Sequence, residues 1–209
     1  GADKIILGTN SIKENDIIKQ ISTKYGNQSI IQSIDCKKIS SNNSEYTVML
    51  NSGTQDFGKD PLTCALEALS YGAGEMLINS IDNDGSLLGY DLELISLLSK
   101  KLDCPTLALG GAGNWQHILD LFEKTNISAA CTQNIFHFTE ESISSLKKFL
   151  KENNIKIRKT LFLLLWVALI LNFRLFFLPF KIPYSLELLL IFIPIVARYN
   201  KRKIISSIG

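Results

Sequence analysis

A short glycine-rich stretch is the most distinctive candidate for a binding site. Gly110-Gly111-Ala112-Gly113 follows an apolar run typical of a strand and precedes a helical pattern. Glycine lets the backbone approach an anion closely, so the amides of such a turn can bind a phosphate group at a helix N-terminus. A tight turn that needs only positive φ is an equally good reading. The stretch does not match the G-x-G-x-x-G spacing of dinucleotide sites.

Aspartates that follow apolar runs are candidates for acid–base chemistry. Asp35 ends a run predicted as a strand, where its carboxyl group would point into the mouth of the sheet and suit general acid catalysis. A helix-capping or turn aspartate is the plainer alternative. Asp82 and Asp84 flank Asn83 ahead of Gly85, but the glutamate of a calcium-binding loop is absent. A turn, or a carboxylate that binds substrate hydroxyl groups, fits these two residues better.

Alternating strand and helix patterns must position these residues. Apolar runs predict strands at 3–7, 29–35, 75–79, 106–109 and 127–132, and amphipathic patterns predict helices at 11–25, 61–71, 91–102, 115–124 and 140–152. Residues 46–60 are predicted as an inserted hairpin and loop. Because the strands lack clean alternation, we expect a parallel sheet under helices, either open and doubly wound or part of a (β/α)₈ barrel. In both folds, functional residues lie at the carboxyl ends of the strands.

Charge and cysteine content exclude several classes of protein. The chain has 209 residues, 46% of them hydrophobic and 20% charged, so it can bury a core. Residues 1–158 hold 15 basic and 19 acidic residues, and this acidic body argues against nucleic-acid binding. The four cysteines are widely spaced and only two histidines are present, so neither a structural zinc site nor a disulfide framework is expected. We therefore expect a cytoplasmic protein without a metal or other cofactor.

A series of short motifs occurs in order along residues 1–158. They are GADK at 1–4, ID at 34–35, GAGE at 72–75, SIDNDG at 80–85, GYD at 89–91, GGAG at 110–113 and IFHF at 135–138. Together they resemble the cyclase subunit of imidazole glycerol phosphate synthase, a (β/α)₈ barrel of histidine biosynthesis. The resemblance implies an α/β fold, a TIM barrel that lacks its first three strands, and a lyase that would be inactive as this chain alone.

The resemblance also implies roles for individual residues. In the family, ammonia from a partner glutaminase crosses the barrel and attacks a bis-phosphorylated ribonucleotide (phosphoribulosyl-formimino-AICAR ribonucleotide), giving imidazole glycerol phosphate and AICAR. Asp35 matches one of two catalytic aspartates, and the other has no counterpart here. Lys4 and Glu75 match residues that gate ammonia entry, and Asp3 lies at the glutaminase-facing surface. Positions that match substrate or phosphate contacts are Thr9, Asp84, Gly85, Gly111 and Asn134.

Departures from the family pattern leave other functions open. Gly8 stands where the family usually has Asn, and Leu109 and Asn134 stand where Ser is usual. These changes lie around the phosphate positions, so a divergent substrate is one alternative: paralogous subunits use the same ammonia chemistry to make amidino or amino sugars for surface polysaccharides. Another alternative is a half-barrel that docks a partner without catalysing a reaction.

Residues 159–209 differ sharply from the body. They hold seven basic residues and a single acidic one, Glu187. Two apolar stretches follow. The first, 161–180, is about as long as a membrane span, and the second, 182–197, is somewhat shorter. Basic residues flank the pair, which predicts a transmembrane helical hairpin with both flanks cytoplasmic and the tail anchored in the inner membrane. A buried helical pair is the alternative. We therefore expect two domains, a partial TIM-barrel cyclase domain at 1–158 and a hydrophobic tail at 159–209.

Overall fold

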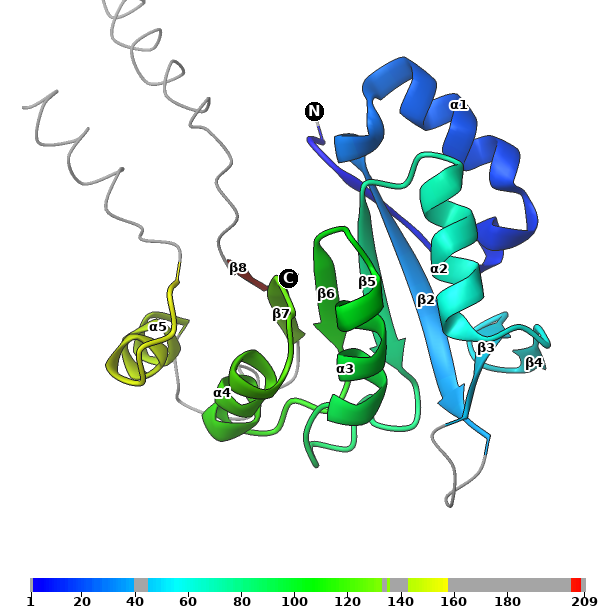
Figure 1. Cartoon of the computed structure of the whole chain (residues 1–209). Coiled ribbons are helices and arrows are strands. Elements are labelled where there is room, and N and C mark those ends of the chain that lie inside the picture. The colour runs from blue at the N-terminus through cyan, green and yellow to red at the C-terminus, as the bar shows by residue number, and fades with distance from the viewer. Residues whose placement is uncertain (1, 40–44, 133–134, 136–142, 158–203, 208–209) are drawn as a thin grey trace, which may run out of the picture. The chain divides into compact units, whose positions relative to one another are not determined.

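The chain forms an α/β fold around one mostly parallel sheet (Figure 1). The computed structural model describes residues 2–39, 45–132, 135, 143–157 and 204–207. In chain order the elements are β1 (Ile5–Leu7), the 3₁₀ helix η1 (Thr9–Lys13), α1 (Asn15–Tyr25), the 3₁₀ turn η2 (Asn27–Ser29), β2 (Ile30–Lys38), β3 (Tyr46–Leu50), β4 (Gln55–Asp56), α2 (Pro61–Ser70), β5 (Glu75–Ser80), α3 (Leu92–Lys101), β6 (Thr106–Leu109), α4 (Trp115–Lys124), β7 (Ala129–Thr132), α5 (Ile143–Glu152) and β8 (Ile204–Ser207).

Successive strand–helix units lie side by side in chain order. β1 pairs with β2, β2 with β5, β5 with β6, β6 with β7 and β7 with β8, all in parallel. The inserted hairpin of β3 and β4 pairs antiparallel with the second half of β2. Strand order therefore never reverses along the parallel part of the sheet, so the fold has no topological switch point of the doubly wound kind.

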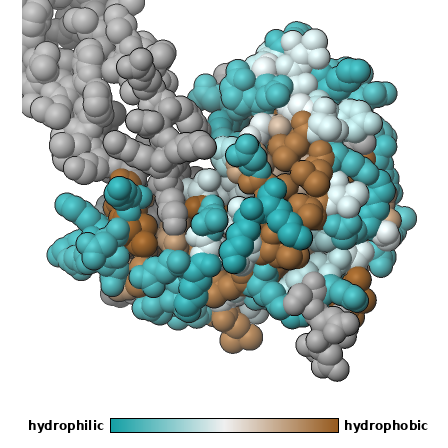
Figure 2. Space-filling model, viewed as in Figure 1, coloured by the Kyte–Doolittle hydropathy of each residue, from teal (hydrophilic) through white to brown (hydrophobic). Residues whose placement is uncertain are grey.

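The helices pack on one face of this sheet. Ile30, Ile34, Met76 and Ile78 contact α1, α2 and α3 in one core cluster, and Ala108 and Ala130 contact α3, α4 and α5 in another. The opposite face carries a separate cluster to which no described helix contributes: Ile31, Leu77, Leu107, Ala129 and Cys131. The helix-covered face is seen in Figure 2, mostly hydrophilic with scattered apolar patches. Helices on one face do not fit a doubly wound sheet and are consistent with part of a (β/α)₈ barrel.

Side-chain caps fix where several helices begin, and so where the loops before them end. Asp60 Oδ1 accepts a hydrogen bond from the Thr63 amide at 3.0 Å, with Pro61 in the first turn as predicted. Asp91 caps α3 through the Leu94 amide, and Asn114 caps α4 through the His117 amide. Each cap satisfies an amide that the helix itself leaves free.

The structure corrects three expectations about the first elements. The strand predicted as buried, β1, has Ile5 37% and Ile6 44% exposed, because among the described residues it pairs with β2 alone. The helix predicted over 11–25 is split into η1 and α1 at Glu14. The strand predicted to end at Asp35 continues to Lys38, because β3 pairs with its last four residues.

The predicted transmembrane hairpin lies outside the described residues. Among those that are described, no helix is long and apolar enough to cross a membrane. The sequence reasoning did not predict β8, which belongs to the same compact unit as residues 1–157. Ile204 and Ile205 are the register partners of Ala129 and Ala130, so β8 occupies the edge of β7.

Candidate functional site

A row of register partners crosses the sheet near the carboxyl ends of its strands. Asp35 on β2 pairs with Asn79 on β5, and Asn79 pairs with Leu109 on β6. Register partners on neighbouring strands share a face. The row lies two residues beyond Leu77 and Leu107, which belong to the helix-free cluster. Asp35, Asn79 and Leu109 therefore face the side of the sheet that has no helices, at the end where barrel enzymes hold their active sites.

Asp35 is held from two sides. Asn79 Nδ2 donates a hydrogen bond to Asp35 Oδ1 at 2.9 Å. The Asp35 backbone amide donates to Thr9 Oγ1 at 3.0 Å, and Thr9 is buried. The first contact fixes the carboxylate and the second fixes the backbone that carries it. The predicted catalytic carboxyl group and the predicted contact residue Thr9 are therefore neighbours.

A cavity of about 210 Å³ lies at the same end of the sheet. It brings together three of the predicted contact residues, Asp84, Gly85 and Gly111. The remaining lining residues are Leu87, Leu109, Gly110, Ala112, Cys131 and Thr132. Leu109 belongs both to this lining and to the row that holds Asp35, and Asn79 on β5 lies between Asp35 on β2 and the cavity wall on β6. Asn134, the fifth predicted contact residue, lies outside the described part of the chain.

Glycine is required in the walls of this cavity because two loops touch through their backbones. Gly110 and Gly111 have φ of 98° and 96°. A β-carbon on Gly111 would lie 2.0 Å from the Gly89 carbonyl oxygen, and one on Gly113 would lie 2.0 Å from that of Leu87. The Gly89 amide also donates to the Gly111 carbonyl at 2.7 Å. The turn interpretation of these glycines is thus correct, and the same geometry leaves bare backbone along the cavity.

Some backbone amides at the start of α4 already donate hydrogen bonds to side chains of the same segment. The Gly113 amide donates to His117 Nδ1 at 3.2 Å, and the His117 amide donates to Asn114 Oδ1 at 2.9 Å. His117 itself is half-buried. Phosphate binding by this segment would therefore depend on the turn before Gly113 more than on the first turn of the helix.

The opposite end of the helix-free face holds the predicted gate residues. Lys4 and Glu75 form an ion pair, and Glu75 is only 9% exposed. Glu75 is the register partner of Ile31, a member of the helix-free cluster, at the amino end of β5. Asp3 is exposed beside Lys4. The structure thus brings the two gate residues together, at the end of the sheet away from Asp35.

Sequence reasoning missed Asn79 as a site residue. A polar residue near the end of the otherwise apolar run Met76–Leu77–Ile78 was the available signal. Only the register of β2 and β5, which sets Asn79 beside Asp35, identifies this polar residue as part of the site.

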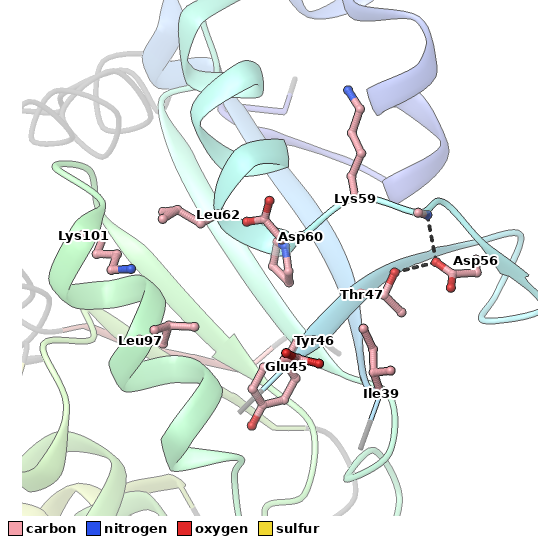
Figure 3. Close-up of a pocket in the computed structure, with 12 residues that line it drawn as sticks. Ile39, Glu45, Tyr46, Thr47, Asp56, Lys59, Asp60, Leu62, Leu97 and Lys101 are labelled. Carbon is pink, nitrogen blue, oxygen red and sulfur yellow. Dashed lines mark hydrogen bonds between the residues drawn. The ribbon is translucent and has the colours of Figure 1, made fainter. Parts of the chain in front are cut away.

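A larger cavity, of about 450 Å³, lies between the β3–β4 hairpin and the helices α2 and α3 (Figure 3). Two of its anionic side chains, those of Asp56 and Asp60, accept hydrogen bonds inside the chain. Hydrogen bonds from the Thr47 hydroxyl and the Gly58 amide lower the pKa of Asp56. Burial tends to raise the pKa of Asp60, but hydrogen bonds from Thr63 outweigh it and leave that pKa lowered. The smaller glycine-lined cavity, which adjoins Asp35, is therefore the better candidate site.

The described residues next to Asp35 support neither cysteine chemistry nor metal binding. Burial, and then the charge of Asp35, raise the pKa of the Cys36 thiol well above its ordinary value, so it is a poor nucleophile. Cys36 also packs in the helix-covered core, on the other face of β2 from Asp35. Within the described ranges, no group of three or more His, Cys, Asp or Glu residues is arranged to hold a metal ion.

The fold and the site define an α/β chain whose parallel strands carry a carboxylate and a glycine-lined cavity at their carboxyl ends. Residues 1–142 match the family described as histidine biosynthesis protein, and the chain belongs to that family. It is 37% identical to the imidazole glycerol phosphate synthase subunit HisF of Streptococcus mutans, 39% to that of a Hydrogenobaculum species and 41% to that of Campylobacter concisus, over 158 residues each. These matches cover 76% of this chain but only 61–62% of the relatives' length.

Proposed function

We propose that this chain carries the substrate cavity and one catalytic carboxylate of the cyclase subunit of imidazole glycerol phosphate synthase, a lyase of histidine biosynthesis. The observation that carries the proposal is that Asp35 on β2 is hydrogen-bonded by Asn79 on β5, the strand between Asp35 and the glycine-lined cavity at β6 and β7. The match to the histidine biosynthesis family, over residues 1–142, includes the whole of this region.

The substrate is a bis-phosphorylated ribonucleotide, which ammonia attacks to give imidazole glycerol phosphate and AICAR. Backbone at Gly85 and Gly111 approaches a phosphate group, because neither residue has a side chain in the way. The Asp84 carboxylate would repel phosphate, so it binds substrate hydroxyl groups instead. Thr9 and Asn134 complete the substrate contacts. Asp35 transfers protons as a general acid or base during cyclisation.

Ammonia comes from a glutaminase subunit that binds the opposite end of the sheet, with Asp3 in the contact surface. The Lys4–Glu75 ion pair, half-buried on the lysine side, lies at that end. Opening this pair would uncover the helix-free face, along which ammonia travels toward Asp35. The two subunits form a heterodimer in the cytoplasm, and the reaction uses no cofactor.

The parallel sheet is part of a TIM barrel that lacks its first three strands. This accounts for β1, which the described residues pair on one side only, and for the helices on a single face. The missing strands supply the second catalytic aspartate, so this chain alone is inactive. Residues 1–158 make up the cyclase domain, and residues 159–209 form a tail whose apolar stretches insert into the membrane as a hairpin.

The test is Asp35→Asn in the full-length cyclase, assayed for ammonia-dependent formation of imidazole glycerol phosphate. Loss of a general acid–base group lowers kcat by about 10²–10⁴-fold. Asp103→Asn is the matched control, because it makes the same change at an exposed position before β6. The control should retain wild-type turnover.

Two results would overturn the proposal. Asp35→Asn with unchanged turnover would mean that this carboxylate does no chemistry, as expected of a docking module. An intact enzyme that fails to restore growth of a histidine auxotroph, yet consumes ammonia with another sugar phosphate, would favour the amidino- or amino-sugar reaction.

A further inference from the structure

The carboxamide of Asn79 uses its nitrogen in a hydrogen bond but not its oxygen, as far as the described residues show. Its Nδ2 donates to Asp35 Oδ1 at 2.9 Å. Its Oδ1 is buried and has no hydrogen-bond partner within the described part of the chain. A buried acceptor without a partner costs free energy, and native structures keep few of them. Such an atom at the edge of a candidate active site therefore calls for a functional reason.

The orientation of this carboxamide is fixed by Asp35. An amide offers two donor hydrogens on nitrogen and only acceptor lone pairs on oxygen. Rotating the group by half a turn would set Oδ1 against the carboxylate oxygen and lose the hydrogen bond. The contact with Asp35 thus holds Nδ2 toward the carboxylate and Oδ1 away from it.

The idle oxygen lies where the glycine-lined cavity begins. A β-carbon added to Gly110 would sit 3.3 Å from Asn79 Oδ1 and 3.4 Å from the Asp84 amide nitrogen. Gly110 lines the cavity. Glycine at this position therefore puts no side chain between Oδ1 and the cavity, and a β-carbon there would also meet the Ser80 carbonyl oxygen at 2.7 Å.

We propose that Asn79 is the positioning residue of Asp35, and that its Oδ1 accepts a hydrogen bond from a hydroxyl or N–H group of the substrate. This rests on the proposed cyclase function. One side chain then couples substrate binding to the orientation of the acid–base group: a donor bound at Oδ1 holds the carboxamide in the rotamer in which Nδ2 grips Asp35.

The experiment measures kcat and KM of the full-length cyclase for three variants. Asn79→Leu keeps the size of the side chain and removes both halves of the carboxamide, so kcat falls at least tenfold and KM rises severalfold. Asn79→Asp keeps an acceptor and removes the donor, so at alkaline pH kcat falls while KM stays within twofold of wild type. Asn126→Leu makes the same apolar change at an exposed position ahead of β7 and leaves both constants unchanged.

Stability separates this role from a merely structural one. Because Oδ1 is unpartnered, Asn79→Leu should have a urea midpoint no lower than that of Asn126→Leu. A loss of activity that follows a lowered midpoint overturns the proposal, as does a kcat/KM within twofold of wild type for Asn79→Leu. Should the leucine variant not fold, Asn79→Asp decides alone, and an unchanged kcat overturns the positioning role. Absence of turnover in the wild-type enzyme would instead contradict the cyclase function itself.

Discussion

The buried polar groups at the two ends of the helix-free face differ in whether they have a partner. At the amino end, Glu75 is nearly buried and forms an ion pair with Lys4. At the carboxyl end, Asn79 Oδ1 is buried with no hydrogen-bond partner among the described residues, and Gly110 and Gly111 have positive φ. Both ends belong to the same strands and differ by a few residues along β5.

At the amino end, the buried charge has its partner within the chain. At the carboxyl end, we expect the partner of the buried acceptor to be a bound ligand. A paired buried charge adds to the stability of the fold only while its partner is present. An unpaired buried acceptor costs stability and persists where function requires it. Substitutions at the two ends should therefore differ in what they change.

The largest loss of stability is expected for Gly111→Ala. The new β-carbon would meet the Gly89 carbonyl oxygen at 2.0 Å, and the residue has a φ of 96°. Steric overlap and backbone strain together should lower the free energy of unfolding by at least about 3 kcal/mol, measured by urea denaturation.

Gly85→Ala separates these two causes. Gly85 has a φ of 75°, but no atom lies within 4 Å of an added β-carbon. Strain alone should cost about 1 kcal/mol. Equal losses for the two variants would show that the loops around Gly111 move apart easily. Backbone contact between the loops would then not explain why glycine is required there.

A loss between those of the two glycine variants is expected at the amino end, for Glu75→Gln. The change leaves the Lys4 ammonium beside a neutral amide in a nearly buried site, so the free energy of unfolding should fall by about 2 kcal/mol. Glu123→Gln, on the exposed side of α4, serves as the control and should be neutral. An equally neutral Glu75→Gln would remove the distinction between the two ends.

The smallest effect is expected for Asp84→Ala. Asp84 lines the cavity and is exposed, so its loss should change the free energy of unfolding by less than about 0.5 kcal/mol. The same variant should bind substrate more weakly, seen as a raised KM in the cyclase assay. A large loss of stability would mean that Asp84 serves the fold rather than a ligand.

Local sequence signals identified the elements and most of the site. The helix predicted to begin at residue 61 is α2, which begins at Pro61. The glycines at 110–113 marked the turn after β6. These features depend on a few neighbouring residues, which is why they can be read from the chain. The length of β2 could not, because the pairing that extends it comes from β3, a separate strand that begins eight positions after β2 ends.

By itself, the sequence determined that the chain alternates strands and helices, that polar and glycine residues follow the strands, and that residues 1–158 differ in charge from the tail. Only the tertiary structure decided that the helices cover a single face, because periodicity in a buried strand does not say which face meets which helix. Only register placed Asn79 against Asp35 and left its oxygen at the cavity. Hydrogen bonds between strands 44 residues apart depend on how the whole sheet aligns, and no local pattern records that alignment.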